Sequence, residues 1–236
     1  MEQAVHLWIE DMEGKSSFIF WKTMMNELFP SMVVESKKNN SELVKAVKNI
    51  HDDDIYLVVM DNSFDNPNVF REQKKLKEYS KGKNVFSLNF ICFEFLLLEF
   101  EHLLDWIYAP EDDFRKTRAD AIDARNALIR TISNGDMNYK NANEIARYDA
   151  NLNNRNIEQL SAKLLYDLTR NTGFEVSKKA IGECWVSECC KWTNRQDDDI
   201  CGLDNGRLSV QEKMQSIYSN TSIHQEFHAI GLEAGQ

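Results

Sequence analysis

The chain has 236 residues, 42% hydrophobic and 28% charged, a balance that is typical of a globular protein and excludes global disorder. Its formal net charge of −10 disfavours a general nucleic-acid coat, because phosphate backbones repel such a protein at long range. The apolar stretches are too short to span a membrane, no signal peptide is visible, and an odd count of five cysteines fits reduced thiols, so we expect a cytoplasmic protein without membrane contact.

The first part of the chain alternates between short apolar runs and amphipathic segments. The apolar runs predict strands at 5–9, 31–36, 55–60 and 84–89. Helical spacing of apolar residues predicts helices in between, one from Ser16 or Ser17 to Phe29, one over 41–50 and one from Phe70 to about Gly82. Strands that alternate with helices and are apolar throughout predict an α/β fold with a parallel four-stranded sheet flanked by helices.

The second part of the chain has a different character. Its apolar residues predict a helix from Phe93 to Ile107, ended by Pro110, and charged helical segments over 112–133 and 141–170. A last helix is expected from Ser209 to about Tyr218. We therefore divide the chain into an α/β domain at 1–110 and an all-helical C-terminal extension at 111–236.

Acidic residues follow the predicted strands at the points where those strands end. Glu10 follows the first strand, Asp61 and Asp65 follow the third, and Glu94 lies in the first turn of the helix after the fourth. Because the carboxyl ends of parallel strands share one edge of the sheet, these acids are expected to face a common cleft. Carboxylates gathered there repel one another unless a cation is present, and Mg²⁺ (or Mn²⁺) prefers oxygen ligands. The alternative is that Asp61 opens a turn and Asp65 caps a helix.

The order of these elements resembles the Toprim fold, the catalytic domain of topoisomerases, primases and OLD-type nucleases. The segment SLNFICFEFLLLEF (87–100) is similar to a signature of RloB and AbiLii-type proteins, an OLD-related, Toprim-like group linked to restriction and phage-abortive loci. The positions in register are Cys92, Phe93, Glu94, Leu96, Leu97, Leu98 and Phe100. The resemblance covers roughly residues 5–107.

This resemblance implies divalent-metal-dependent cleavage of nucleic acid, with Glu10, Asp61 and Asp65 as metal ligands and Glu94 as a fourth catalytic residue. The chain departs from the family pattern in three places near these acids. Either Glu10 or the Glu13 of Glu13-Gly14 is the counterpart of the family's first glutamate, and we favour Glu10 because it follows the apolar run directly. The acidic pair is spaced Asp-x-x-x-Asp rather than Asp-x-Asp, and Glu99 stands where histidine is usual.

Basic residues lie close in sequence to the proposed cleft. The helix after the third strand carries Arg71, Lys74 and Lys75, and Lys15 precedes the first helix. Such side chains are candidates for binding a phosphate backbone. The alternative for the helix is a solvated face, because Glu72 and Glu78 dilute its positive charge.

Four of the cysteines fall in a short region at Cys184, Cys189, Cys190 and Cys201. Their spacing, C-x₄-CC-x₁₀-C, is not a standard paired zinc-knuckle pattern. Buried reduced thiols among apolar residues are the reading that the sequence favours over a zinc site.

Two functions are compatible with these features. The first is a Mg²⁺-dependent nuclease acting on DNA or RNA, an effector in bacterial antiphage defence. The second is a non-catalytic, Toprim-like binding or regulatory protein that uses its helical half as a surface for a partner protein or a second copy of itself. The altered motifs and the acidic net charge favour the second.

Overall fold

A parallel sheet organises the N-terminal half of the computed structural model, which describes residues 3–109, 113–190, 201–203 and 206–234. The strands are β1 (Val5–Ile9), β2 (Val33–Ser36), β3 (Ile55–Val59) and β4 (Val85–Leu88), followed much later by β5 (Val176–Ser177) and β6 (Ala180–Ile181). The first four strands pair in parallel in the order β2-β1-β3-β4, which confirms the predicted parallel α/β sheet.

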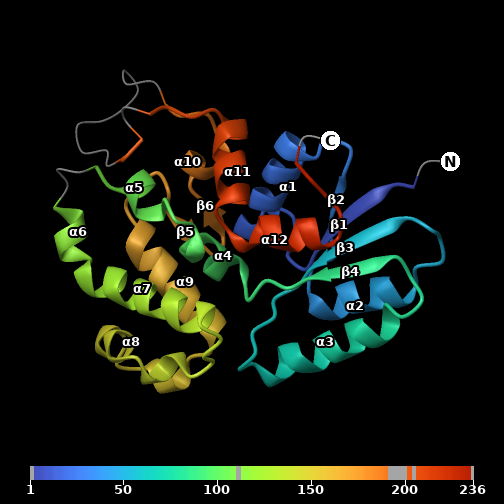
Figure 1. The fold of residues 1–236 in the computed structure, drawn as a ribbon, viewed down its shortest axis with the longest axis horizontal. Helices are drawn as coiled ribbons and strands as arrows, with labels where there is room; N and C mark the ends of the chain where they lie inside the picture. The colour runs from blue at the N-terminus through green and yellow to red at the C-terminus, as the bar shows by residue number, and fades with distance from the viewer. Residues whose placement is uncertain (1–2, 110–112, 191–200, 204–205, 235–236) are drawn as a thin grey trace.

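Helices cover both faces of this sheet and predominate in the described part of the C-terminal half. Those of the first half are α1 (Ser16–Leu28), α2 (Asn40–Lys48), α3 (Pro67–Tyr79), α4 (Phe93–Glu99) and α5 (Leu103–Ile107). Those that follow are α6 (Phe114–Thr117), α7 (Ala119–Ser133), α8 (Asn143–Tyr148), α9 (Ile157–Thr169), α10 (Glu183–Val186), α11 (Val210–Ser219) and α12 (Ser222–Ala229), with 3₁₀ turns η1 (Tyr139–Asn141) and η2 (Leu152–Asn154). Figure 1 shows α2 and α3 on one face of the sheet and α1, α11 and α12 on the other.

Alternation along the strands produces two cores, one on each face of the sheet. Trp8, Tyr56 and Val58 point to the face covered by α2 and α3 and form a small apolar cluster there. Leu7 and Ile9 point the opposite way, because successive side chains of a strand leave opposite faces. Both faces are therefore buried, which explains why these strands read as unbroken apolar runs.

The larger core extends without interruption from the sheet into the C-terminal half. Phe29 at the end of α1 packs against Tyr218 of α11 edge-on and against Phe227 of α12 at a tilt, with ring centroids 5.7 and 5.2 Å away. Glu99 at the end of α4 accepts a hydrogen bond from the backbone N–H of Ser222 at 2.7 Å, so it holds the first turn of α12. The extension thus packs directly on the α/β half and completes its core.

The long helices expected after residue 92 are interrupted. The predicted helix over 93–107 breaks at Phe100, where the buried Arg125 donates to the carbonyls of Leu98 (2.7 Å) and Phe100 (2.9 Å). These carbonyls lie at the end of α4, where no intrahelical donor remains, and the guanidinium supplies the missing hydrogen bonds. The segments over 112–133 and 141–170 are similarly divided into shorter helices.

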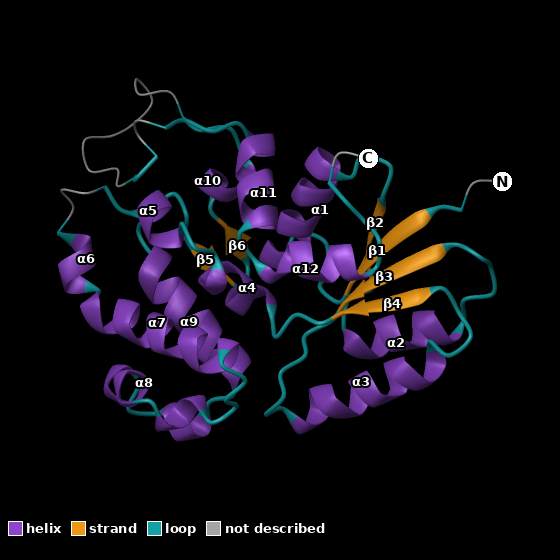
Figure 2. Ribbon diagram, viewed as in Figure 1, coloured by secondary structure: helices purple, strands orange, loops and turns teal. Residues whose placement is uncertain are grey.

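The C-terminal extension also contains a two-stranded antiparallel hairpin, β5–β6, so the expectation of an all-helical extension is wrong. Figure 2 shows this hairpin among the helices between α1 and α9, away from the main sheet. Within the ranges that the structure describes, no helix has both the length and the apolar character needed to cross a membrane.

Candidate functional site

The site begins at the exit of β1, where a tight turn leads into α1. Glu10 directly follows the strand, and Gly14 adopts φ +83°, a conformation that side chains with a Cβ rarely take. The turn is closed by a hydrogen bond of 3.1 Å from the Lys15 N–H to the Met12 carbonyl. The reversal leaves Glu10 and Asp11 facing a cavity at the carboxyl end of the sheet, while Glu13 is exposed and does not line it.

Two further predicted acids reach the same cavity from neighbouring elements. Asp61 follows β3, the strand next to β1, and its backbone N–H donates to Oε2 of Glu10 at 3.2 Å. Glu94 enters from the first turn of α4, whose N-terminus is capped by the Cys92 thiol. The sheet and the helix that follows it therefore bring Glu10, Asp61 and Glu94 together, as the sequence predicts.

A fifth acid, Glu158, comes from the C-terminal half, and the sequence analysis did not predict it. It lies in the first turn of α9, which Asn156 and Gln159 start with reciprocal capping hydrogen bonds. The Asn-x-x-Gln pattern was visible in the sequence as a helix start. Nothing in it indicates that this helix end faces the sheet, because that placement depends on packing between distant segments.

Burial and mutual repulsion raise the pKa values of these carboxyl groups. Burial, followed by the charge of Asp11, raises the pKa of Glu10 to about 8. Burial and the charges of Glu10 and Glu94 raise the pKa of Asp61 well above its usual value. Burial also raises the pKa of Glu94, to about 7, and that of Glu158. The cavity therefore favours a cation or bound protons among its acids.

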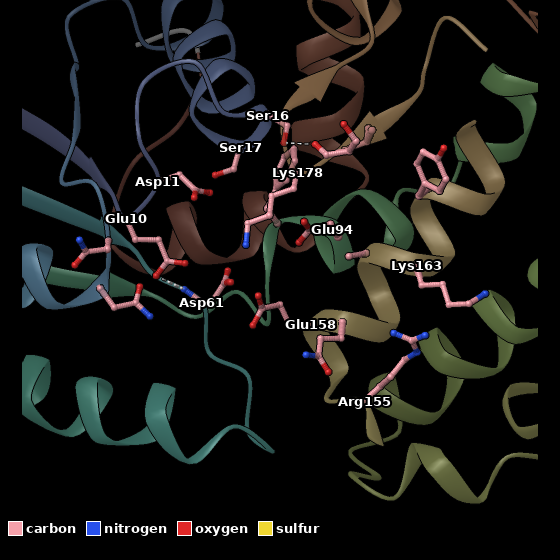
Figure 3. Close-up of a pocket in the computed structure, with 18 of the residues that line it drawn as sticks. Glu10, Asp11, Ser16, Ser17, Asp61, Glu94, Arg155, Glu158, Lys163 and Lys178 are labelled. Carbon is pink, nitrogen blue, oxygen red and sulfur yellow. Dashed lines mark hydrogen bonds between the residues drawn. The ribbon is translucent and has the colours of Figure 1, made fainter. Parts of the chain in front are cut away.

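A lysine from the β5–β6 hairpin faces the acidic group. Lys178 occupies the turn of the hairpin and extends into the cavity toward Glu10 and Asp61 (Figure 3). Burial raises the pKa of Glu158, and the positive charge of Lys178 offsets part of that rise. Lys178 forms no ion pair with any residue that the structure describes. The hairpin is fixed to α1 by a hydrogen bond of 2.8 Å from Ser16 Oγ to the Ser177 carbonyl. No sequence pattern indicated this residue.

The cavity is roomy, and its walls include the start of a helix as well as the acids. Its volume is about 760 Å³, and its walls include Ser16 and Ser17 at the N-terminus of α1. Lys15, at the N-cap of this helix, makes no side-chain capping hydrogen bond. Backbone N–H groups at such a helix end favour anions. The N-terminus of α1, where the helix dipole is positive, thus lies at the same cavity as the acids.

Asp65 does not line this cavity. Its carboxylate accepts hydrogen bonds from the Tyr139 hydroxyl (2.7 Å) and from the Ile157 backbone N–H (3.1 Å). It therefore holds the first turn of α9, next to Glu158, instead of facing Glu10 and Asp61. We remove it from the candidate metal ligands, since both of its oxygens are directed to protein donors.

The four basic residues proposed for nucleic-acid binding are spread over different surfaces. Arg71 and Lys75 on α3 line a second cavity of about 490 Å³ that shares Glu10, Asp61 and Glu158 with the first. Lys75 also pairs with Glu72 at 2.7 Å. Lys74 lines a separate cavity between α3 and β4, and Lys15 lines neither cavity that contains the acids. Only Arg71 and Lys75 thus continue the acidic cavity outward.

The acids fit a hard cation by chemistry but do not form a closed cage. Among the described residues, no three His, Cys, Asp or Glu side chains stand in an arrangement that could hold a metal ion. Mg²⁺ commonly keeps several waters and is held by one or two carboxylates together with substrate phosphates. Glu10 and Asp61 are two such carboxylates that line one cavity, and the Asp61 N–H donates to Glu10 at 3.2 Å.

Comparisons with known proteins identify no relative of this chain: no family model matches it, and neither does any curated protein or solved structure.

Proposed function

We propose that this chain is a Mg²⁺-dependent nuclease that hydrolyses phosphodiester bonds of DNA or RNA. The observation that carries the proposal is the convergence of Glu10, Asp61 and Glu94 from separate elements on one cavity that also contains Lys178. Raised pKa values among these acids indicate a place where positive charge is favourable. Antiphage defence is the biological role that the resemblance to RloB and AbiLii-type proteins implies.

Glu10 and Asp61 would hold the cation. Ionising both carboxylates in this environment is costly without a counter-charge, and a divalent ion supplies it. When bound, Mg²⁺ polarises a phosphoryl oxygen and increases the acidity of a nearby water. Mn²⁺ has the same ligand preference and would occupy the same pair.

Glu94 is suited to proton transfer. Its pKa of about 7 lets it accept a proton from water and release it again near neutral pH. It lines the same cavity as Glu10 and Asp61, on the side formed by α4. Glu158, on α9, is the second carboxyl group able to carry a proton at this place, since its pKa is also raised.

Lys178 and the N-terminus of α1 would bind the phosphate. Arg155 and Lys163 also line the cavity, but they are engaged by Asp149 and Asp167 respectively. Lys178 has no such carboxylate partner among the described residues, so its ammonium is available to a substrate oxygen. The strand leaving the site would pass Arg71 and Lys75 in the adjoining cavity.

The test is cleavage of end-labelled single- and double-stranded DNA and RNA with Mg²⁺, Mn²⁺ or a chelator. We expect metal-dependent cleavage that Asp61→Asn reduces to background. Lys178→Ala should lower the rate by on the order of 10²-fold, as expected for loss of a phosphate clamp. Lys179→Ala is the matched control, since Lys179 is the other turn residue and does not line the cavity. Cleavage undiminished in Asp61→Asn would reject the assignment.

A second candidate, a binding or regulatory protein without catalysis, is favoured by two observations. The described residues offer no closed set of three metal ligands, and the net charge of −10 opposes association with nucleic acid. On this alternative, neither Mg²⁺ nor Mn²⁺ changes the melting temperature, and no nucleic acid is cut under any of the conditions above.

A further inference from the structure

Four cysteines that are spread over 18 positions of sequence meet at one small cavity. Cys184, Cys189, Cys190 and Cys201 line a space of about 20 Å³, together with Phe174, Leu203 and Arg207. The structure records Cys184, Cys189 and Cys190 as free thiols. Buried reduced thiols dispersed in an apolar core, the reading that the sequence favours, would not be expected to line a common cavity.

Separate backbone contacts hold the segments that carry these thiols. The N–H of Cys184 donates to the Gly173 carbonyl at 3.0 Å, and a Cβ on Gly173 would lie only 2.4 Å from the Cys184 sulfur. Cys189 and Leu208 exchange two hydrogen bonds, one of them from the Leu208 N–H to the Cys189 sulfur at 3.4 Å. Amide donors to cysteine sulfur are suited to stabilising thiolates.

The segment carrying Cys201 is held just as closely. The next residue, Gly202, donates its N–H to the Trp106 carbonyl at 2.9 Å. A Cβ at Gly202 would lie 1.7 Å from the Asp105 carbonyl oxygen, so only glycine allows this approach. The end of α5 thereby fixes the position of Cys201 opposite α10.

Positive charge is buried beside the thiols. Lys213 of α11 is fully buried, and its ammonium donates to the carbonyls of Cys184 (2.8 Å) and Ser187 (2.9 Å). It forms no ion pair with any carboxylate in the described ranges. A buried, unneutralised lysine is costly unless negative charge lies nearby. Four thiolates around one divalent cation carry a net charge of about −2, which Lys213 and Arg207 would offset.

We propose that Cys184, Cys189, Cys190 and Cys201 bind one structural Zn²⁺ ion. Four thiolates and a compact cavity match the tetrahedral, sulfur-rich coordination that zinc takes in structural sites. As positioned, no three of the described His, Cys, Asp or Glu side chains form a metal-binding arrangement, so binding requires the thiols to turn inward about fixed backbones. The ion would join α10 to the residues directly after it and to the segment before α11, near the hairpin that carries Lys178.

The first experiment measures the metal content of the purified, full-length chain by mass spectrometry. We expect about one equivalent of zinc in the wild type, and loss of it in Cys184→Ser and Cys201→Ser. Cys92→Ser is the matched control, because Cys92 is the remaining cysteine and caps α4, a role that serine also performs. Asp61→Asn should retain its zinc, which separates this site from the acidic cavity.

A second measurement covers the case in which the cysteine variants do not fold. Wild-type chain refolded with Co²⁺ should show the intense sulfur-to-metal charge-transfer absorption of tetrahedral thiolate coordination, and zinc should displace it. Folded wild-type chain that contains no zinc, and acquires neither metal on refolding, would overturn the proposal. Zinc that persists when Cys184 and Cys201 are both replaced would overturn it equally. Either result leaves the nuclease proposal standing, because that depends on different residues.

Discussion

At the scale of single residues, the acids of the cavity make stability depend on pH. The pKa of Glu10 rises from 4.5 to about 8 on folding, so the folded chain binds more protons than the unfolded chain between these values. The stability that this proton provides is complete below about pH 4.5 and is lost as the pH rises through about 8. Asp61 and Glu94 shift in the same direction and add to the effect.

Replacing Glu10 by glutamine should remove much of this dependence. Between pH 6 and pH 9, we expect the melting temperature of the metal-free wild type to fall by roughly 5–10 °C more than that of Glu10→Gln. Added Mg²⁺ should restore the wild type at pH 8 and have little effect on the variant. Thermal unfolding followed by circular dichroism measures both. Glu13→Gln is the control, since Glu13 is exposed outside the cavity, and equal slopes in all three proteins would contradict the prediction.

The two aspartates after β3 show what the sequence could and could not resolve. Both follow the end of a strand, so their positions in the sequence predict both of them as residues of the site. Asp61 faces Glu10, whereas Asp65 is turned away by the Tyr139 hydroxyl and the start of α9. Those partners lie 74 and 92 residues further along the chain, so no local pattern could have separated the two roles.

At the scale of elements, local signals predicted the sheet well and the second half poorly. The apolar runs of β1 and β3 are determined by burial on both faces, a property that any short window of sequence displays. The break after α4 depends instead on Arg125, whose guanidinium donates hydrogen bonds to the carbonyl groups of Leu98 and Phe100. Glu158 and Lys178 could not be predicted for the same reason: contacts between segments far apart in the sequence bring α9 and the hairpin to the cavity.

The β5–β6 hairpin provides an element-scale prediction. Ser16→Ala removes the hydrogen bond from α1 to the Ser177 carbonyl, a loss of about 1 kcal/mol in local stability. Amide hydrogen exchange over 176–182 should then accelerate about fivefold, and metal-dependent cleavage should slow because Lys178 is less well positioned. Thr23→Ala is the matched control: the Thr23 hydroxyl bonds the Ile19 carbonyl within α1 and does not contact the hairpin. Equal exchange in the two variants would show that the hydrogen bond does not hold the hairpin.

At the scale of the whole molecule, the continuous core joins the two halves of the chain. The division at residue 110 follows a change in sequence pattern, yet the apolar cluster on the α1 face of the sheet runs from Leu7 to Phe227. The site depends on this union, because Glu10 and Asp61 come from one half and Glu158 and Lys178 from the other. The candidate site therefore forms only when both halves fold together.

The chain should consequently unfold as one unit, and residues 1–110 alone should not fold. The fragment lacks Tyr218 and Phe227, so Phe29 loses two aromatic contacts of about 0.5–1.5 kcal/mol each, together with the surface they bury. It also lacks Arg125, whose guanidinium holds the carbonyl groups at the end of α4. Calorimetry of the full chain should give a single transition, whereas the fragment 1–110 should show none. Co-expression with 111–236 is the control, since the complementary fragment restores the missing core. A fragment that melts cooperatively by itself would establish an independent α/β domain and refute the shared core as the source of stability.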